Sequence, residues 1–344
     1  MNKLSVLVLA FVLGIVSFGY AGDAIPHFSG LVYGDFYSIP SHHDGKVQGE
    51  DGLLFRRIFL TYDEDLKDSL AFRLRFEAAS DDFTKPSNTV VPFVKDAWMK
   101  YSYLENQYAY LGLIESPAFG WLEKQWGLRS VEKTPLDLQG WALSREQGLG
   151  LGGVLAGNEY FLTVGNGSSE SSEGTDIGKR ASLRLNRGLG AGFSAMTYGD
   201  VASSAKGYLA PDSYFYTLQE FLGWKGQVGR LGLLYGRQVQ VLPNTNDEKV
   251  KDMVSGYVVG HVADSLEVFG RLDHMLYGST SKAGIKYLDL AAQRSTLAIV
   301  GLDWQMAPNL NIQPNVEAAY YQNDAGGAVS SEDIIPRLTF YMQF

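Results

Sequence analysis

The sequence predicts an all-β fold: a transmembrane antiparallel β-barrel of about sixteen strands with one long loop folded inward. Three observations lead to this prediction. Apolar and polar residues alternate with period two in many segments, short and long connections follow one another, and the chain ends on Phe344 inside an amphipathic segment. The composition agrees, because 39 Gly, 20 Tyr and 18 Phe beside only 11 Pro suit many strands joined by turns.

The alternation is clearest at residues 70–80, LAFRLRFEAAS. Leu70, Phe72 and Leu74 fall on one face, and Arg73 and Arg75 fall on the other. A soluble sandwich would bury the apolar face, whereas a membrane barrel turns it to lipid and turns the charges into a wet lumen. One strand fits both architectures, so the number and spacing of such segments must decide.

The connections favour the barrel. Seven short turns are expected near residues 63–69, 104–107, 157–158, 187–190, 225–227, 263–265 and 307–309. Eight longer polar loops alternate with them, near residues 39–52, 80–92, 116–147, 166–178, 200–212, 242–251, 277–293 and 323–332. Short turns at one rim and long loops at the other are typical of outer-membrane barrels. The facing of residues 148–156, 214–224 and 252–262 is left open.

Residues 1–21 have the features of a signal peptide. Lys3 is followed by an apolar run, and Gly19-Tyr20-Ala21 offers small residues for cleavage. The run is too short for a membrane-spanning helix, which needs roughly 20 apolar residues. We therefore expect residues 22–344 to form one barrel domain in the bacterial outer membrane. The net charge of −9 excludes nucleic acid as a partner, and zero Cys excludes disulfides.

Four stretches carry a resemblance to a known family. They are Phe55-Arg56-Arg57-Ile58, Val94-Lys95-Asp96-Ala97-Trp98, the run from Gly112 to Gly120, and Gly301-Leu302-Asp303-Trp304 with Ala307-Pro308-Asn309-Leu310. In this order they resemble the phosphate-selective porin O and P family. The resemblance implies a sixteen-stranded, homotrimeric porin. Leu113 and Glu115 depart from the Gln and Lys usual in that family.

The charged faces of the predicted strands are candidates for lining the pore, because a barrel of sixteen strands is too wide to be filled by its own side chains. These candidates are Arg57, Arg73, Arg75, Glu77, Asp96, Lys100, Arg184 and Arg271. Both signs are present, so the family's fold carries over better than its preference for phosphate.

The segment 116–147 is the candidate for narrowing the lumen. Trp121, Leu122, Gln125 and Trp126 have the spacing of a short helix with one face on the wall. The residues expected at the constriction are Trp121, Glu123, Lys124, Trp126, Arg129, Glu132 and Lys133. The alternative is a loop that covers the outer mouth and contributes only packing.

The aromatic residues allow two interpretations. Those near strand ends suit interfacial girdles, namely Tyr33, Tyr37, Tyr62, Tyr101, Tyr160 and Trp304. Trp121, Trp126 and Trp141 in the inner loop are the ones considered for stacking against a sugar.

No catalytic pattern is present, so no enzyme is expected. The chain lacks a Cys nucleophile, a Gly-x-Ser-x-Gly motif and a phosphate-binding loop. His42-His43 beside Asp44 lie in a Gly-rich loop without spaced partners, and we expect them to be solvated. No metal or cofactor is predicted.

The function expected from these patterns is passive diffusion of ions and small hydrophilic solutes through a porin surrounded by outer-membrane lipid. A channel specific for phosphate or a sugar is the first alternative. A soluble, exported all-β binding protein or carbohydrase is the second.

Overall fold

The computed structural model describes residues 27–79, 90–167, 179–203, 214–241, 248–276, 294–322 and 332–344. The expected signal peptide, residues 1–21, and most of the predicted long loops lie outside these residues.

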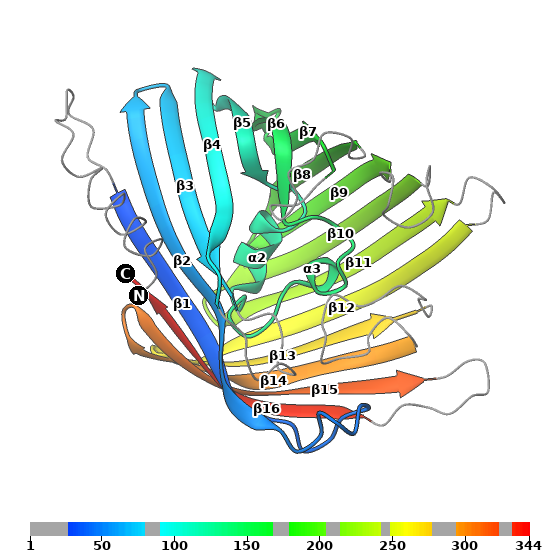
Figure 1. Ribbon diagram of the computed structural model, residues 1–344. Helices are drawn as coiled ribbons and strands as arrows, with labels where there is room; N and C mark the ends of the chain where they lie inside the picture. Colours follow the sequence, from blue (N-terminus) through cyan, green and yellow to red (C-terminus); the bar gives the residue numbers. More distant parts are fainter. Residues whose placement is uncertain are drawn as a thin grey trace.

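Sixteen strands form one closed antiparallel ring (Figure 1). The first eight are β1 (His27–Ser38), β2 (Asp51–Lys67), β3 (Leu70–Ala78), β4 (Phe93–Leu104), β5 (Gln107–Glu115), β6 (Arg145–Leu155), β7 (Asn158–Gly165) and β8 (Arg180–Gly190). The second eight are β9 (Phe193–Ser203), β10 (Tyr214–Gly226), β11 (Gly229–Val241), β12 (Glu248–Ala263), β13 (Leu266–Met275), β14 (Arg294–Ala307), β15 (Leu310–Gln322) and β16 (Asp333–Gln343). Each strand pairs with its sequence neighbours, and β1 pairs with β16. The predicted fold class is confirmed.

The two rims differ as predicted. At one rim, seven connections of two residues each join β2–β3, β4–β5, β6–β7, β8–β9, β10–β11, β12–β13 and β14–β15. In two of them an Ala-Gly pair has positive φ at both positions, as a type I′ turn requires: φ is 51° and 77° at Ala156-Gly157 and 48° and 84° at Ala191-Gly192. Strands β2 and β8 run further than the alternation indicated, so the turns expected at 63–69 and 187–190 lie closer to residues 68–69 and 191–192. The long connections are at the other rim.

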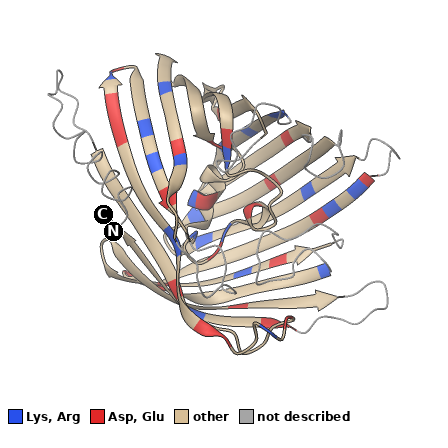
Figure 2. Cartoon of the chain, in the orientation of Figure 1, with Lys and Arg blue, Asp and Glu red and all other residues tan. Residues whose placement is uncertain are grey.

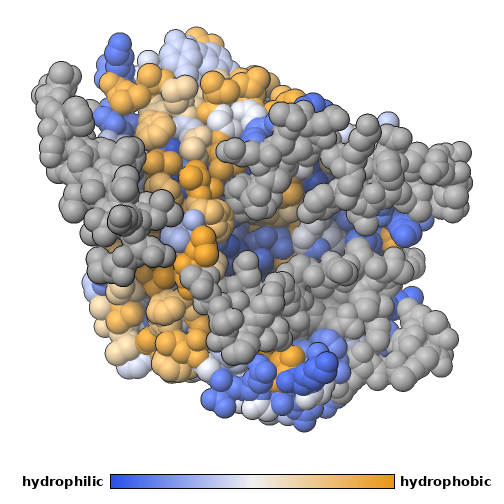
Figure 3. Space-filling model, in the orientation of Figure 1, coloured by the Kyte–Doolittle hydropathy of each residue, from blue (hydrophilic) through white to orange (hydrophobic). Residues whose placement is uncertain are grey.

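The outer face of the ring is mainly apolar. Figure 3 shows this as orange over the wall that is not covered by grey atoms. The exposed aromatic side chains form two groups, one near each rim. Those towards the short turns are Phe28, Tyr101, Tyr103, Phe193, Trp304 and Phe344, and those towards the long loops are Phe36, Phe55, Tyr214, Tyr216 and Tyr320. Such a band between aromatic girdles is the surface that hydrocarbon covers in a membrane barrel. None of the helices in the described ranges is long and apolar enough to span a bilayer.

Two of the aromatic residues expected in the girdles face the lumen instead. Tyr33 is 2% exposed, and its hydroxyl accepts a hydrogen bond from Arg129 of the inner loop. Tyr37 packs against a buried apolar cluster inside the barrel. On β1 the outward positions are those of Phe28, Val32 and Phe36, so the odd-numbered residues of this strand point inward.

The inner face explains two of the three segments whose facing the sequence leaves open, 214–224 and 252–262. On β10, Phe221 points inward and Leu218 and Leu222 point outward, so both faces contain large apolar residues. Strand β12 is alike, with Met253 and Val259 inward. The alternation fails on these strands because part of the inner wall is covered by protein rather than by water.

Substitutions at Leu233 and Val228, which belong to one hairpin, test whether lipid covers the apolar outer face. Leu233 lies on the outer face of β11 and is 62% exposed, whereas Val228 lies in the turn and is 72% exposed. We expect Leu233→Arg to lower the free energy of unfolding in lipid bilayers by about 2–4 kcal/mol and Val228→Arg by about 0–1 kcal/mol, because the cost of a charge falls towards the interface. Urea titration in vesicles measures both. Equal costs would contradict a hydrocarbon layer over Leu233.

Candidate functional site: the constricted lumen

The connection between β5 and β6 enters the barrel, as predicted. It contains α2 (Gly120–Trp126) and α3 (Pro135–Leu138), which lie inside the ring of strands in Figure 1. Gly127 ends α2 in the left-handed conformation, with φ of 75°, and its N–H donates to the carbonyl of Glu123. The buried residues of α2 are Leu122 and Trp126, which confirms a short helix with one face on the wall.

Apolar contacts hold this loop against one side of the barrel. Trp126, at the end of α2, meets Tyr257 and Phe269 edge-on, with ring centroids 5.1 and 6.2 Å apart. The first buried cluster joins the loop residues Trp126, Leu128, Val131 and Leu138 to Val259, Phe269, Leu297, Ile299, Ala319, Tyr321 and Ile335 of the wall. The second joins Ala118, Phe119, Leu122, Leu136, Trp141 and Ala142 to Met196, Tyr198, Phe221, Leu234, Met253 and Met275. Strands β9 to β16 thus supply an apolar seat for the loop.

A buried charge network fixes the centre of the loop. Glu132 is 0% exposed and accepts two hydrogen bonds from Arg56, at 3.0 and 3.1 Å. A nitrogen of Arg337, on β16, lies 3.7 Å from the same carboxylate, and Arg337 also pairs with Glu317. Burial opposes the charge of Glu132, but Arg56 and Arg337 outweigh burial and lower the pKa of Glu132.

Two further arginines attach the loop. Arg129 donates to Glu123 at 2.8 Å and to Asp137 at 3.1 Å, and the pKa of Asp137 is lowered because Lys133 and Arg129 outweigh its burial. Arg271, on β13, donates to the backbone carbonyl of Lys133 at 2.5 Å. These bonds satisfy buried polar groups that an irregular loop would otherwise leave unpaired.

Two β-bulges each turn a pair of consecutive charged residues into the lumen. The pairing of β1 with β2 shifts so that Arg56 has no partner, and the pairing of β3 with β4 shifts at Lys95. A bulge inserts one extra residue and re-aims side chains. Arg56 therefore contacts the loop beside Arg57, and Lys95 reaches Glu77 at 3.1 Å beside Asp96.

The space left by the loop lies along β3 to β8. A cavity of about 280 Å³ is lined by Arg73, Arg75, Asp96, Trp98, Tyr108, Tyr110, Ile114, Glu115, Ser116, Gly120, Trp121, Lys124, Glu159, Phe161 and Arg184. Blue bands on β3 and β4 in Figure 2 mark basic residues on this side. The rings of Trp98 and Phe161 lie beneath the guanidinium groups of Arg73 and Arg184, at 5.3 and 5.9 Å. The lining therefore combines aromatic faces with charges of both signs.

The structure brings some of the predicted site residues together at this cavity and places others elsewhere. At the cavity are Arg73, Arg75, Asp96, Arg184, Trp121 and Lys124. Arg73 pairs with Asp63 at 2.6 Å, and Arg75 pairs with Asp96 at 3.1 Å. Arg57 and Glu77 pair with each other at 2.8 Å, and Lys100 lies over the Tyr108 ring at 4.7 Å.

The remaining predicted residues hold the loop in place. Arg271, Trp126, Arg129 and Glu132 contact the wall or the loop itself, and Glu123 pairs with Arg129. Lys133 contributes its carbonyl to this attachment. Glu132 was expected to border the opening, but it is buried instead. Its carboxylate balances the charges of the inward-facing Arg56 and Arg337. Trp126 and Trp141 are each 2% exposed and buried against the wall, so Trp121 is the loop tryptophan that borders the cavity.

Sequence reasoning missed several residues. The sequence does not predict Arg56 and Arg337 as residues that hold the loop, nor Trp98, Tyr108 and Tyr110 as residues that line the cavity. The inward parity of Trp98 was visible next to Asp96 and Lys100. In the sequence, the only sign of the bulge at Arg56 is the pair of consecutive arginines, Arg56 and Arg57.

Comparisons with solved structures support the architecture. The chain is similar to the anion-selective porin from Comamonas acidovorans, with a TM-score of 0.71 and 12% identity over 94% of this chain and 100% of that one. It is similar to the outer membrane channel DcaP of Acinetobacter baumannii, with a TM-score of 0.63 and 13% identity over 95% and 99%. It is also similar to in-vitro folded OmpT in its trimer form, an outer membrane protein of Vibrio cholerae, with a TM-score of 0.60 and 12% identity over 93% and 100%.

No family model matches the sequence, and no curated protein matches it. At these identities the structural likenesses establish the fold, a sixteen-stranded barrel shared with porins. The finer assignment to the phosphate-selective O and P family stays a prediction.

Removing the charge of Glu132 should loosen the loop. Glu132→Gln removes the carboxylate that Arg56 and Arg337 share in the loop and leaves them Asp35 and Glu317 of the wall, and we expect the free energy of unfolding to fall by about 3 kcal/mol. Glu123→Gln is the matched control, because its pair with Arg129 is partly exposed and is worth about 0–1 kcal/mol. Urea titration and single-channel recordings follow both variants. If the single-channel current of Glu132→Gln has the same conductance and no more fluctuation than that of the unsubstituted protein, this network does not hold the loop.

The lowered pKa of Glu132 gives a dependence on pH. A carboxyl group whose folded-state pKa is lowered contributes its full stability above the ordinary glutamate pKa of about 4.3, and this contribution is lost as pH falls from there through the folded value. The difference in unfolding free energy between the unsubstituted protein and Glu132→Gln should shrink as pH falls below about 4.3. A difference that stays unchanged from about pH 5 to about pH 3 would contradict the ion pairing.

Proposed function

We propose that this chain is an outer-membrane porin, a passive channel for ions and small hydrophilic solutes, and not an enzyme. One observation carries the proposal. A closed ring of sixteen strands is apolar outside and contains, between its wall and an inward loop, a cavity lined by Arg, Lys, Asp and Glu side chains. Backbone groups in hydrocarbon must all be paired, and a closed barrel achieves this.

The loop determines what such a channel admits. A barrel of sixteen strands encloses an aqueous space, and the loop occupies the side of this space next to β9–β16 with apolar side chains. The passage that remains is narrow and polar. Permeation by small hydrophilic solutes follows, because apolar solutes gain nothing from a charged, hydrated lining.

The charges at the cavity favour a weak preference for anions. Four basic residues line it, Arg73, Arg75, Lys124 and Arg184, and three acidic residues, Asp96, Glu115 and Glu159. The name of the Comamonas porin, anion-selective, agrees with this direction. The nearly balanced charges argue for a general channel over a site dedicated to phosphate.

A solute-specific channel is the second candidate. The rings of Trp98 and Tyr110 meet edge-on, with centroids 5.0 Å apart, and Tyr108 and Tyr110 meet at 5.4 Å. Aromatic faces beside charged groups suit a sugar or another ring-bearing solute. If such a solute binds, it should interrupt the ion current in discrete steps.

We also propose a homotrimer in the outer membrane, reached after removal of residues 1–21 as a signal peptide. The trimer form of Vibrio cholerae OmpT supports the assembly. A polar set on the outer face also supports a protein neighbour. Tyr235 donates to Asp252 at 2.6 Å, and Arg237 lies 3.6 Å from Asp252. Charges on a lipid-facing wall are costly, and a subunit contact reduces this cost.

Planar-bilayer recordings of the refolded protein test the proposal. We expect discrete conductance steps, a reversal potential in a KCl gradient that indicates a slight preference for chloride, and a current little affected by millimolar phosphate or maltose. Block by phosphate or by a sugar would favour the solute-specific channel. Recovery of the protein in the soluble periplasmic fraction, without heat-modifiable gel mobility, would overturn the porin.

Reversing charges at the cavity should change the ion preference. We expect Arg73→Glu, Arg75→Glu and Lys124→Glu each to shift the reversal potential towards cations, because each adds negative potential inside a low-dielectric wall. Arg187→Glu makes the same charge change on an exposed residue near the short-turn rim of β8 and should leave the reversal potential nearly unchanged. If Lys124→Glu behaves like Arg187→Glu, α2 does not border the permeation path.

A further inference from the structure

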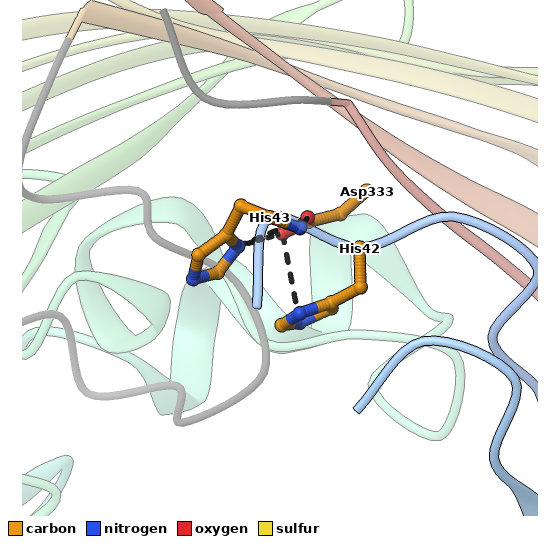
Figure 4. Close-up of side chains that lie close together, drawn as sticks. All are labelled: His42, His43 and Asp333. Carbon is orange, nitrogen blue, oxygen red and sulfur yellow. Dashed lines mark hydrogen bonds and ion pairs between the residues drawn. The ribbon is translucent and has the colours of Figure 1, made fainter. Parts of the chain in front are cut away.

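Two histidines and one aspartate meet at the long-loop rim, away from the cavity. His42 and His43 belong to the connection between β1 and β2, and Asp333 is the first residue of β16. An isolated β-bridge joins Ser41 to Ile334, with the Ile334 N–H donating to the Ser41 carbonyl at 3.0 Å. Backbone pairing therefore places the three side chains together, although 290 residues separate His43 from Asp333. Figure 4 shows both imidazole rings directed at the carboxylate.

The site is largely enclosed. His42 is 2% exposed and Asp333 is 0% exposed, and the side chain of His43 retains 22% exposure. The two rings stack with their centroids 4.3 Å apart. The expectation that these histidines are solvated is therefore wrong for His42, because the β-bridge folds the loop onto β16.

The distances suit a transition-metal ion. His43 Nδ1 lies 2.9 Å and His42 Nε2 lies 3.9 Å from Asp333 Oδ2, and the three ligand atoms all lie within 4.8 Å of one another. Two ligands of a tetrahedral zinc ion, each about 2.1 Å from the metal, are about 3.4 Å apart. The two distances from the imidazole nitrogens to Asp333 Oδ2 lie about 0.5 Å below and above this value, so side-chain movements of about half an ångström or more would bring the ligands into tetrahedral positions.

The neighbouring groups orient the three ligands. Asp333 Oδ1 accepts the backbone N–H of His43 at 2.7 Å, and Tyr321 donates its hydroxyl to Oδ2 at 2.5 Å. The Nδ1 of His42 accepts the backbone N–H of Asp44 at 2.9 Å. This bond orients the ring and favours the tautomer with its proton on Nε2, the proton that a metal ion bound at Nε2 would displace. Such partners fix the tautomer and orientation of metal ligands.

We propose that His42, His43 and Asp333 form a binding site for a divalent transition-metal ion, with Zn²⁺ as the preferred ion. Two imidazole nitrogens and one carboxylate oxygen suit Zn²⁺ and exclude Mg²⁺ and Ca²⁺, which prefer oxygen ligands alone. The exposed side of His43 leaves room for a water molecule as the fourth ligand.

A metal ion bound here would cross-link the β1–β2 connection to β16 at the long-loop rim of the barrel. The connection between β1 and β2 also contains Ile39 and Val47, which pack with Trp126 and Leu128 of the inner loop. An ion bound by His42, His43 and Asp333 ties this connection to β16. Metal binding should therefore stabilise the folded barrel and the contact between the two loops, without entering the cavity along β3 to β8.

Titration of the tag-free, refolded full-length protein with Zn²⁺ alone tests the site. We expect one Zn²⁺ per chain, no heat of binding with Mg²⁺, and a higher unfolding temperature with Zn²⁺. His42→Ala, His43→Ala and Asp333→Asn should each weaken binding at least about 100-fold, and Tyr321→Phe, which removes an orienting bond, about tenfold. His261→Ala is the matched control, because His261 pairs with Glu267 at 3.0 Å near the opposite rim and should leave the affinity unchanged.

Zinc X-ray absorption of the unsubstituted protein makes the test independent of how the variants fold. Two imidazole ligands and one carboxylate in the first coordination shell would support the site. A spectrum without imidazole, or equal affinity in His43→Ala and His261→Ala, would overturn it.

Discussion

The closure of the hydrogen-bond ring is the constraint on which the rest of the structure depends. An open sheet edge would leave a row of unpaired N–H and C=O groups against hydrocarbon. β1 and β16 remove these edges by pairing from Leu31 with Gln343 to Tyr37 with Arg337. The first and last strands are joined at the short-turn rim, where Gly30 and Phe344 exchange backbone hydrogen bonds of 2.7 and 3.0 Å. With the wall fixed in this way, function depends on what occupies the interior.

One side of the barrel interior supports the inner loop, and the other side borders the open cavity. Strands β9–β16 present apolar side chains that seat the inner loop, and β3–β8 present charges and aromatic rings to the open space. The buried pairs around Glu132 fasten the loop where the ring closes, because Arg56 comes from β2 and Arg337 from β16, on either side of β1. The division explains why one loop can pack against one side of the lumen and leave a polar cavity on the other.

The sequence was sufficient for the fold and for part of the site. Arg73 and Arg75 were placed inward because the opposite face of β3 is apolar, whereas β10 and β12, apolar on both faces, gave no such signal. The bulges at Arg56 and Lys95 depend on pairing with neighbouring strands, which period-two alternation does not record. The burial of Glu132 and the meeting of His42 with Asp333 depend on contacts between distant segments, and a single sequence contains no trace of them.

The inward positions of β6 have a consequence for the bore of the channel. Gly150 and Gly152 carry no side chain, and the rings of Phe161 and Tyr108 occupy the space where a Cβ atom would lie, 3.0 and 2.3 Å away. These rings come this close to the backbone because the glycines lack a Cβ atom. A methyl group at either position would push an aromatic ring towards the middle of the opening. The diameter of the channel here is therefore determined by two missing side chains, and small substitutions on β6 offer evolution a simple way to change the size of solute admitted.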